Sequence, residues 1–288
     1  MISVFSIIGY QQINQSNIYW IKGLATCQPF LLFLQVIKPH SKSTKSKKEQ
    51  IQSMFNIIAP TYDTINKYMT LNSDKKWRRK VSKIVYEKNA KNILDVATGT
   101  GDIAIEMARD NVKIIAIDNA NEMLEIAKEK SKYLKTDKII DFKLDDAEDL
   151  KFEDNMFDAV TVGFGVRNFE NLEKGLLEMN RVLKPGGQVV ILETAVPQTL
   201  LSKIGYFLHT NILIPFLGLI IAKNSNAYKY LSKSAKNFPH GNKFKKILHD
   251  TGFEDIEIRS ETFGVVNIYS GLKQINNWFN TWKILKFF

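Results

Sequence analysis

A glycine-rich turn flanked by carboxylates is the part of this sequence best suited to chemistry. The segment LDVATGTGDIA places Gly99, Gly101 and Ala104 in the spacing G-x-G-x-x-G/A, which brings a strand-to-helix loop close to a bound cofactor. Asp118 ends the next apolar run, where an acid can accept hydrogen bonds from ribose hydroxyls. The pattern indicates a cofactor that contains a nucleoside.

The charge of this turn distinguishes between two cofactors. A dinucleotide places its pyrophosphate on the N-terminus of the first helix, but that position holds Asp102, and Asp95 lies just before the turn. A third acidic segment, Asp145-Asp146-Ala147-Glu148, could read an adenine amino group and ring nitrogen through a carboxylate and a backbone amide. Carboxylates suit the ammonium and sulfonium of S-adenosylmethionine. Methyl transfer is therefore favoured, and a nicotinamide-dependent oxidoreductase is the alternative.

Alternating strands and helices must position these acids. From Asn92 onward, short Ile- and Val-rich runs alternate with amphipathic helices, which is typical of a parallel sheet covered on both faces. Two more strands are expected in DIEIRS and GVVNIYSG. A helix before the sheet, in KKEQIQSMFNIIAP, is expected to stop at Pro60. The prediction is an α/β fold with a doubly wound, mostly parallel, seven-stranded sheet.

The composition narrows the function classes. A chain of 288 residues with 44% hydrophobic and 24% charged residues is long enough for one large domain and is not disordered throughout. It has one cysteine and four histidines without ligand-like spacing, so neither a disulfide framework nor a metal site is expected.

The two ends of the chain show less regular strand and helix patterns than its centre. Residues 1–37 match neither a signal peptide nor a transit peptide, and we expect an appendage or an over-called translation start. Residues 38–273 are expected to form the main domain, and residues 274–288 a second appendage. Leu200 to Ala222 is the most apolar stretch, but His209, Asn211 and Pro215 interrupt it. A helical apolar cap over a site, at about residues 200–240, is expected rather than a membrane span.

The sequence resembles the menaquinone/ubiquinone biosynthesis C-methyltransferases from about Lys38 to Lys273. The glycine turn and RVLKPGG occur in many methyltransferases, whereas APTYD, FGVRN and YLSKSAKNFP are more particular. The resemblance implies a class I, Rossmann-like methyltransferase fold and methyl transfer from S-adenosylmethionine to a polyprenylated quinol. Two segments, KKEQ near the start of the matching region and ATGTGD in the glycine turn, are closer to the family members that act only in menaquinone biosynthesis. The implied substrate is therefore demethylmenaquinol, and a benzoquinol of the ubiquinone pathway is the alternative.

The resemblance also implies individual site residues. The implied cofactor contacts are the glycine turn with Gly99, Thr100 and Gly101, then Asp118, and then the pair Asp146 and Ala147. The chain departs from the family at two positions. Gly163 stands where the family usually has a serine that contacts the cofactor, and Thr194 stands where a phenylalanine is common.

Two residues are candidates for catalysis if the substrate is a quinol. A reduced ring carbon beside a phenolic oxygen is nucleophilic, and ionising that oxygen makes it more so. Arg167 could stabilise the phenolate, because a guanidinium stays cationic and donates in a fixed plane. Tyr62 could bond the other oxygen or relay a proton. Alternatively, Arg167 pairs with an acid such as Glu170, and Tyr62 belongs to a lid.

The uneven charge suggests a polyanionic partner. The net charge is +10, with no acid before Glu49 and none between Glu193 and Asp250. An anionic membrane surface is expected, because the basic segment is threaded with Leu and Ile, whereas a nucleic-acid methyltransferase would need exposed aromatics beside the cleft. The expected location is the cytoplasmic face of the membrane, with peripheral attachment.

Overall fold

The structure is a computed structural model that describes residues 37–40, 43–197, 202–203, 205 and 225–275. All of them lie in one compact unit, Ile37–Phe288. Within the described residues, no helix combines the length and the apolarity that a bilayer span requires. The apolar stretch Leu200 to Ala222 lies outside the described residues, except for 202–203 and 205.

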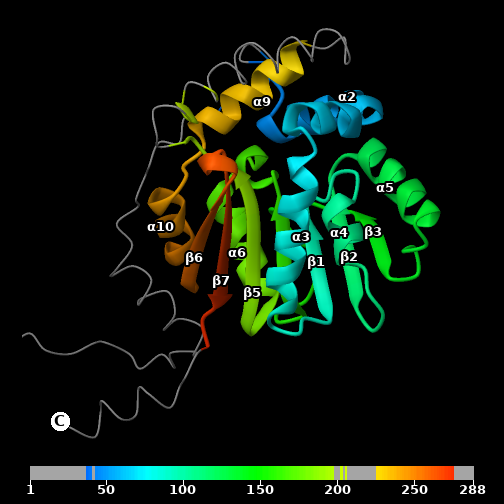
Figure 1. The fold of residues 1–288 in the computed structure, drawn as a ribbon, viewed down its shortest axis with the longest axis vertical. Coiled ribbons are helices and arrows are strands. Elements are labelled where there is room, and N and C mark those ends of the chain that lie inside the picture. The colour runs from blue at the N-terminus through cyan, green and yellow to red at the C-terminus, as the bar shows by residue number, and fades with distance from the viewer. Residues whose placement is uncertain (1–36, 41–42, 198–201, 204, 206–224, 276–288) are drawn as a thin grey trace, which may run out of the picture. The chain divides into compact units, whose positions relative to one another are not determined.

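A seven-stranded sheet forms the centre of this unit (Figure 1), as predicted. The strand order is β3-β2-β1-β4-β5-β7-β6, with β1 to β5 parallel and β7 antiparallel to both of its neighbours. The order reverses between β1 and β4, which is where doubly wound sheets bind ligands. The strands are β1 (Asn92–Val96), β2 (Lys113–Asp118), β3 (Ile140–Leu144), β4 (Phe157–Gly163), β5 (Leu183–Thr194), β6 (Phe253–Glu261) and β7 (Val266–Lys273).

Helices cover both faces of the sheet because the central strands are apolar on both sides. Ile93 and Leu94 are adjacent on β1, point to opposite faces and are both 0% exposed. Ile93 packs in a cluster with α3 and α4, and Leu94 in a cluster with α6 and α10. These helices are α3 (Ser73–Tyr86), α4 (Asp102–Met107), α6 (Leu172–Val182) and α10 (Asn242–Asp250), and α5 (Asn121–Tyr133) lies beside β3.

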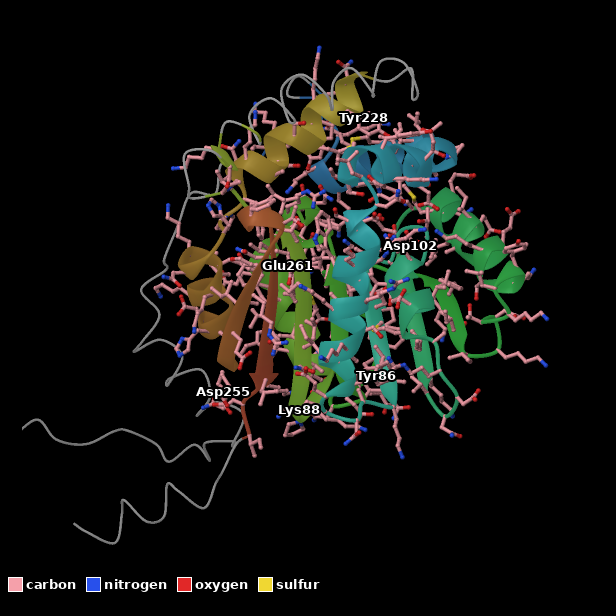
Figure 2. All side chains as sticks on the ribbon, in the orientation of Figure 1. Tyr86, Lys88, Asp102, Tyr228, Asp255 and Glu261 are labelled. Atoms are coloured by element: carbon pink, nitrogen blue, oxygen red, sulfur yellow. The ribbon has the colours of Figure 1, made fainter. Side chains whose placement is uncertain are left out.

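Two more helices lie across the carboxyl edge of the sheet (Figure 1): α2 (Lys47–Thr70) and α9 (Ser225–Asn237). A third cluster joins them, in which Ile58 of α2 and Tyr228 of α9 are almost fully buried (Figure 2). Helix α2 begins at a capping box, where Ser46 Oγ accepts from the Glu49 amide at 3.1 Å and the Glu49 carboxylate accepts from the Ser46 amide at 2.7 Å. These helices form a roof over the sheet edge where ligands are expected.

The expected helix end at Pro60 was wrong, because α2 continues through Pro60 to Thr70. Pro60 lies on the exposed side of the helix, where water can reach the carbonyl that loses its donor. The opposite face of the helix is buried both before and after the proline. Its buried residues include Ile51, Ile58 and Ile65. Tertiary packing therefore outweighs the local cost of the proline.

Candidate active site

The glycine turn after β1 has the backbone geometry that its sequence predicts. Gly101 has a φ of 81°, and a Cβ at this position would lie 3.0 Å from Ala127 Cβ. Gly99, with a φ of 57°, donates its amide to Asp118 at 2.8 Å. Only a residue without a side chain fits at Gly101, so the turn approaches α5 and the cofactor position closely.

Asp118 closes one side of a cavity at the switch point. One carboxylate oxygen accepts from the Gly99 amide at 2.8 Å, and the other accepts from the Ala120 amide at 2.9 Å. The carboxyl lines the cavity, and burial raises its pKa. Two backbone donors thus fix its orientation, while the remaining lone pairs can accept from a ligand.

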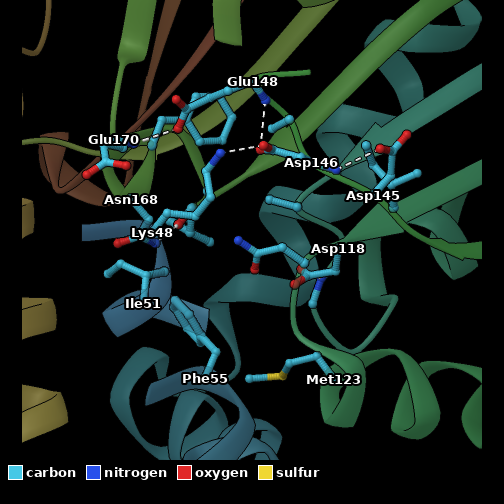
Figure 3. Close-up of a pocket in the computed structure, with 18 of the residues that line it drawn as sticks. Lys48, Ile51, Phe55, Asp118, Met123, Asp145, Asp146, Glu148, Asn168 and Glu170 are labelled. Carbon is cyan, nitrogen blue, oxygen red and sulfur yellow. Dashed lines mark hydrogen bonds and ion pairs between the residues drawn. The ribbon is translucent and has the colours of Figure 1, made fainter. Parts of the chain in front are cut away.

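Asp146 and Ala147 line the same cavity from the segment after β3 (Figure 3). Asp146 Oδ1 accepts from the Glu148 amide at 3.0 Å, and Oδ2 forms an ion pair with Lys48 of α2. Together with the open space at its mouth, the cavity has an empty volume of about 710 Å³. The carboxylates of Asp118 and Asp146 follow the neighbouring strands β2 and β3.

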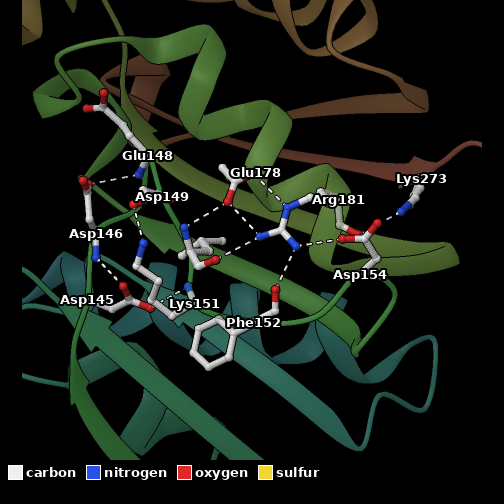
Figure 4. Close-up of polar contacts among 11 residues, drawn as sticks. Asp145, Asp146, Glu148, Asp149, Lys151, Phe152, Asp154, Glu178, Arg181 and Lys273 are labelled. Carbon is white, nitrogen blue, oxygen red and sulfur yellow. Dashed lines mark hydrogen bonds and ion pairs between the residues drawn. The ribbon is translucent and has the colours of Figure 1, made fainter. Parts of the chain in front are cut away.

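Arg181 of α6 holds the segment that carries Asp146 (Figure 4). Its guanidinium donates to the carbonyls of Leu150 at 2.9 Å and Phe152 at 2.8 Å, and it pairs with Glu178 and Asp154. Arg181 is the arginine of RVLKPGG, so this common motif fixes the segment on the Asp146 side of the cavity. The sequence analysis did not assign it a role.

Helix α2 closes the cavity through polar contacts with the segments after β1, β2 and β3. The contacts are Lys48 with Asp146, Gln52 Nε2 with the Asn119 carbonyl at 2.6 Å, Asn56 Oδ1 with the Glu122 amide at 3.1 Å, and Asp63 Oδ1 with Thr100 Oγ1 at 2.6 Å. The helix therefore lies as a strap along the cofactor cavity.

Lys47 joins the same helix to the segment after β4. Its ammonium donates to the carbonyls of Arg167, at 3.3 Å, and Phe169, and its amide donates to Glu170 at 2.9 Å. Burial lowers the pKa of Lys47 to about 8. Glu170, named as an example of an acid with which Arg167 would pair if it were not catalytic, instead accepts from Lys47, and Arg167 pairs with a different acid, Glu193.

The two acids that favoured S-adenosylmethionine differ in their surroundings. Asp95 is 1% exposed and accepts from the hydroxyls of Thr98 and Thr161, both at 2.6 Å, and burial raises its pKa to about 6. Asp102 (Figure 2) pairs with Lys130 at 2.6 Å and Arg78 at 2.8 Å. The charge of Asp102 is thus compensated by protein cations, so the prediction that it faces a ligand cation loses its main support.

A second, larger cavity meets the first at a common wall. Together with the open space at its mouth it has an empty volume of about 2100 Å³. Most of its exposed surface is apolar, with Met69, Trp77, Leu231 and Val266 in the lining, but Asp74, Asp102, Arg78 and Arg167 also line it. The two cavities share Tyr62, Ala97, Gly99, Gly163 and Phe164. Thr100 and Arg167 line only the larger cavity, whereas Asp118 and Asp146 line only the smaller one.

Arg167 is the main buried cation of the larger cavity. It forms an ion pair with Glu193, which is 0% exposed and lies near the carboxyl end of β5. Thr194 donates to the same carboxylate through its amide at 2.7 Å and its hydroxyl at 3.0 Å. Arg167 Nε is buried and has no acceptor among the described residues. One donor of the guanidinium is therefore unpaired in the described part of this structure.

Tyr62 stands in the common wall, and burial raises its pKa. It packs edge to face on Phe55, with ring centroids 6.0 Å apart. A phenol is protonated at neutral pH at its ordinary pKa, and the raised pKa means that Tyr62 gives up this proton even less readily. Its place on α2 is consistent with the lid role, and its place in the wall also puts it between the two cavities.

At Gly163, where the chain departs from the family pattern, the space beside the Cα is occupied by the end of the Ile103 side chain. A Cβ at this position would lie 2.3 Å from Ile103 Cδ1 of α4. The isoleucine thus fills the space into which a serine side chain would project. Glu193 was also not predicted, although its place at a strand end on the ligand side was visible in the sequence.

The fold and the site together define a class I, S-adenosylmethionine-dependent methyltransferase. The ubiE/COQ5 methyltransferase family model matches residues 43–273, and the chain belongs to this family. Within the described residues, no group of three or more His, Cys, Asp or Glu side chains could hold a metal ion.

Similar proteins carry quinone-related names. The chain is 41% identical over 239 residues to a demethylmenaquinone methyltransferase of Bacteroides fragilis, covering 82% of this chain and 97% of that protein. It is 42% identical to a ubiquinone/menaquinone biosynthesis C-methyltransferase of Geotalea daltonii, covering 79% and 97%. A methyltransferase structure from Thermotoga maritima, described as a possible histamine N-methyltransferase, has a TM-score of 0.56 at 16% identity, covering 78% and 100%. This last likeness concerns the fold alone.

Proposed function

We propose that the protein transfers the methyl group of S-adenosylmethionine to a ring carbon of a polyprenylated quinol, converting demethylmenaquinol to menaquinol. The observation that carries the proposal is the pair of cavities, one acidic and one apolar, that meet at a wall beside a buried guanidinium. The names of the similar proteins support the quinone substrate.

The smaller cavity is the proposed cofactor site. Asp118 suits the ribose hydroxyls, and Asp146 with the Ala147 amide suits the adenine edge. Gly99 and Gly101 let the backbone approach the ligand. Thr100 lines only the larger cavity, and its hydroxyl donates to Asp63. We therefore assign it a backbone contact with the part of the cofactor that faces that cavity. S-adenosylmethionine supplies an electrophilic methyl group when bound.

The larger cavity is the proposed quinol site. Arg167 can direct its Nε–H to the phenolate oxygen, while Glu193 holds the guanidinium plane. Tyr62 can donate to the second ring oxygen from the common wall. The common wall also excludes water and aligns the ring carbon with the methyl group. Such alignment can lower the activation free energy of methyl transfer by about 7 to 11 kcal/mol in good cases.

The domain and its location form part of the same proposal. Residues 38–273 form the methyltransferase domain, with appendages on either side. Helix α9 lines the larger cavity with Leu231 and Ala235, and it exposes Lys229 and Lys233 to solvent. An apolar inner face and a basic outer face suit a cap that contacts anionic headgroups. We place the protein peripherally on the cytoplasmic face of the membrane.

Labelled S-adenosylmethionine tests the function. It is incubated with the protein and either demethylmenaquinol or a demethylated ubiquinol precursor, each kept reduced. Label in the naphthoquinol supports the proposal, label only in the benzoquinol replaces the substrate, and label in neither refutes it. Asp118→Ala, expected to lose cofactor affinity in calorimetry, tests the cofactor site separately.

A further inference from the structure

Two large apolar side chains stand exposed at the opening of the larger cavity. Leu71, between α2 and α3, is 78% exposed, and Phe263, in the turn η3 (Thr262–Gly264), is 87% exposed. Both also line the cavity. A residue that lines a cavity and remains mostly exposed lies at its mouth.

The backbone at both positions is unfavourable for bulky side chains. Leu71 has a φ of 50° and Phe263 a φ of 58°, in the left-handed region that favours glycine and asparagine. Neither side chain is buried, so packing does not offset this cost. Leu71 ends α2 as a left-handed C-cap, so its backbone serves the helix end while its side chain remains exposed.

Helix α3, which follows the Leu71 turn, is bonded to the residues just before Phe263. Trp77 of α3 donates its indole N–H to Thr262 Oγ1 at 2.9 Å. Lys80 of α3 pairs with Glu261 at 2.7 Å, just before η3. Both turns lie at the carboxyl edge of the sheet (Figure 1).

Basic side chains accompany the Leu71 turn. Lys67, Lys75, Lys76 and Arg79 are exposed, and none of them has a carboxylate within ion-pair distance among the described residues. The nearby acids are already neutralised, since Asp74 pairs with Arg78 at 2.6 Å and Glu261 pairs with Lys80. The mouth therefore presents apolar tips beside uncompensated positive charge.

We propose that this mouth is the surface that docks on an anionic lipid bilayer. Leu71 and Phe263 enter the layer below the headgroups, and Lys67, Lys75, Lys76 and Arg79 contact anionic headgroups. The inference rests on the proposed function, because a prenyl tail must pass between the larger cavity and the acyl layer. A mouth that faces the bilayer lets the ring enter the cavity while the tail stays in lipid.

The size and charge of the surface favour lipid over a second protein. Two apolar side chains are too few for a stable protein interface, which buries about 800 Å² per partner. A bilayer needs no complementary shape, and each cation near an anionic surface strengthens binding by about fivefold.

Vesicle binding of the full chain tests the proposal. Vesicles of phosphatidylcholine alone are compared with vesicles that also contain phosphatidylglycerol, at low salt. The double variant Leu71→Asn, Phe263→Asn removes the apolar tips, and asparagine tolerates the left-handed backbone, so the fold is expected to persist. We expect binding to the mixed vesicles to weaken about tenfold or more. The double variant Lys75→Gln, Lys76→Gln should weaken it about twentyfold, and less at high salt.

Matched controls lie far from the mouth. Tyr133 is 85% exposed and Lys132 is exposed, both at the end of α5, so Tyr133→Asn and Lys132→Gln should bind vesicles as the wild type does. Thermal melting verifies that each variant is folded. Wild-type affinity in both mouth variants, or an equal loss in the controls, would overturn the proposal, and so would dimerisation through the mouth seen by light scattering.

The proposed function is judged by a different measurement. Methylation of a short-chain, soluble demethylnaphthoquinol by the wild type needs no bilayer. If the wild type methylates it and the mouth variants keep their vesicle affinity, the docking surface is wrong and the function stands. If the wild type leaves it unmethylated while the mouth variants lose vesicle affinity, the function is wrong and the surface stands.

Discussion

At the scale of single residues, the pair of Arg167 and Glu193 governs the proposed chemistry. Arg167→Lys keeps the charge but loses the planar guanidinium and the free Nε donor. We expect kcat to fall by about 10²- to 10³-fold. The Kd for S-adenosylmethionine should stay unchanged, because Arg167 lines only the larger cavity. Initial rates and calorimetry measure the two quantities.

Glu193→Gln is the companion variant. It keeps an acceptor for Thr194 but leaves the Arg167 charge buried without a partner, so it should also lower stability by about 3 kcal/mol or more. A wild-type kcat in Arg167→Lys would remove Arg167 from the mechanism.

The buried acid Asp95 makes stability depend on pH. Burial raises its pKa from 3.8 to about 6, so the folded state favours the protonated carboxyl. This contribution to stability is complete below about pH 4 and is lost as the pH rises through 6. The free energy of unfolding of the wild type minus that of Asp95→Asn should fall by about 2 to 3 kcal/mol from pH 4 to pH 7. Urea unfolding measures it, and a difference that stays constant with pH would contradict the expectation.

At the scale of elements, α4 contacts β4 at position 163 through Ile103. Gly163→Ser would press on Ile103 Cδ1, the flexible end of that side chain, and should cost about 0.5 to 1.5 kcal/mol as the isoleucine turns away. Ile103→Val removes that atom and alone should cost about 0.5 to 1.5 kcal/mol. The double variant should cost less than the sum of the two single variants, as measured by thermal and urea unfolding. Simple additivity would show that the two positions are independent.

The order of the elements was predictable because hydrophobic periodicity and turn-forming residues are local features of the sequence. The alternating apolar runs after Asn92 gave the strands and their helices, and the glycine turn with Asp118 located the switch point. The path of α2 was not predictable, because the packing that carries it past Pro60 comes from α5 and α9. The partners of Arg167 and Asp102 were also hidden, because Glu193, Lys130 and Arg78 are distant in sequence.

At the scale of the whole molecule, α2 couples the cofactor cavity to the rest of the fold. It contacts the segments after β1, β2, β3 and β4, through residues from Lys47 to Asp63. A ligand that binds these segments therefore also stabilises the strap. At a hundredfold excess over its Kd, such a ligand adds about 2.7 kcal/mol to the free energy of unfolding.

Hydrogen exchange can detect this coupling. With S-adenosylhomocysteine bound, we expect slower exchange along Lys47 to Asp63 and in the segments that it contacts, because local opening of the strap then requires loss of the ligand. Helix α10 and strand β6 lie at the other end of the sheet and should show less protection. Asp118→Ala, with the same ligand added, serves as the control and should show no change. Protection confined to the turn after β1, with α2 unaffected, would mean that the strap does not respond to the cofactor.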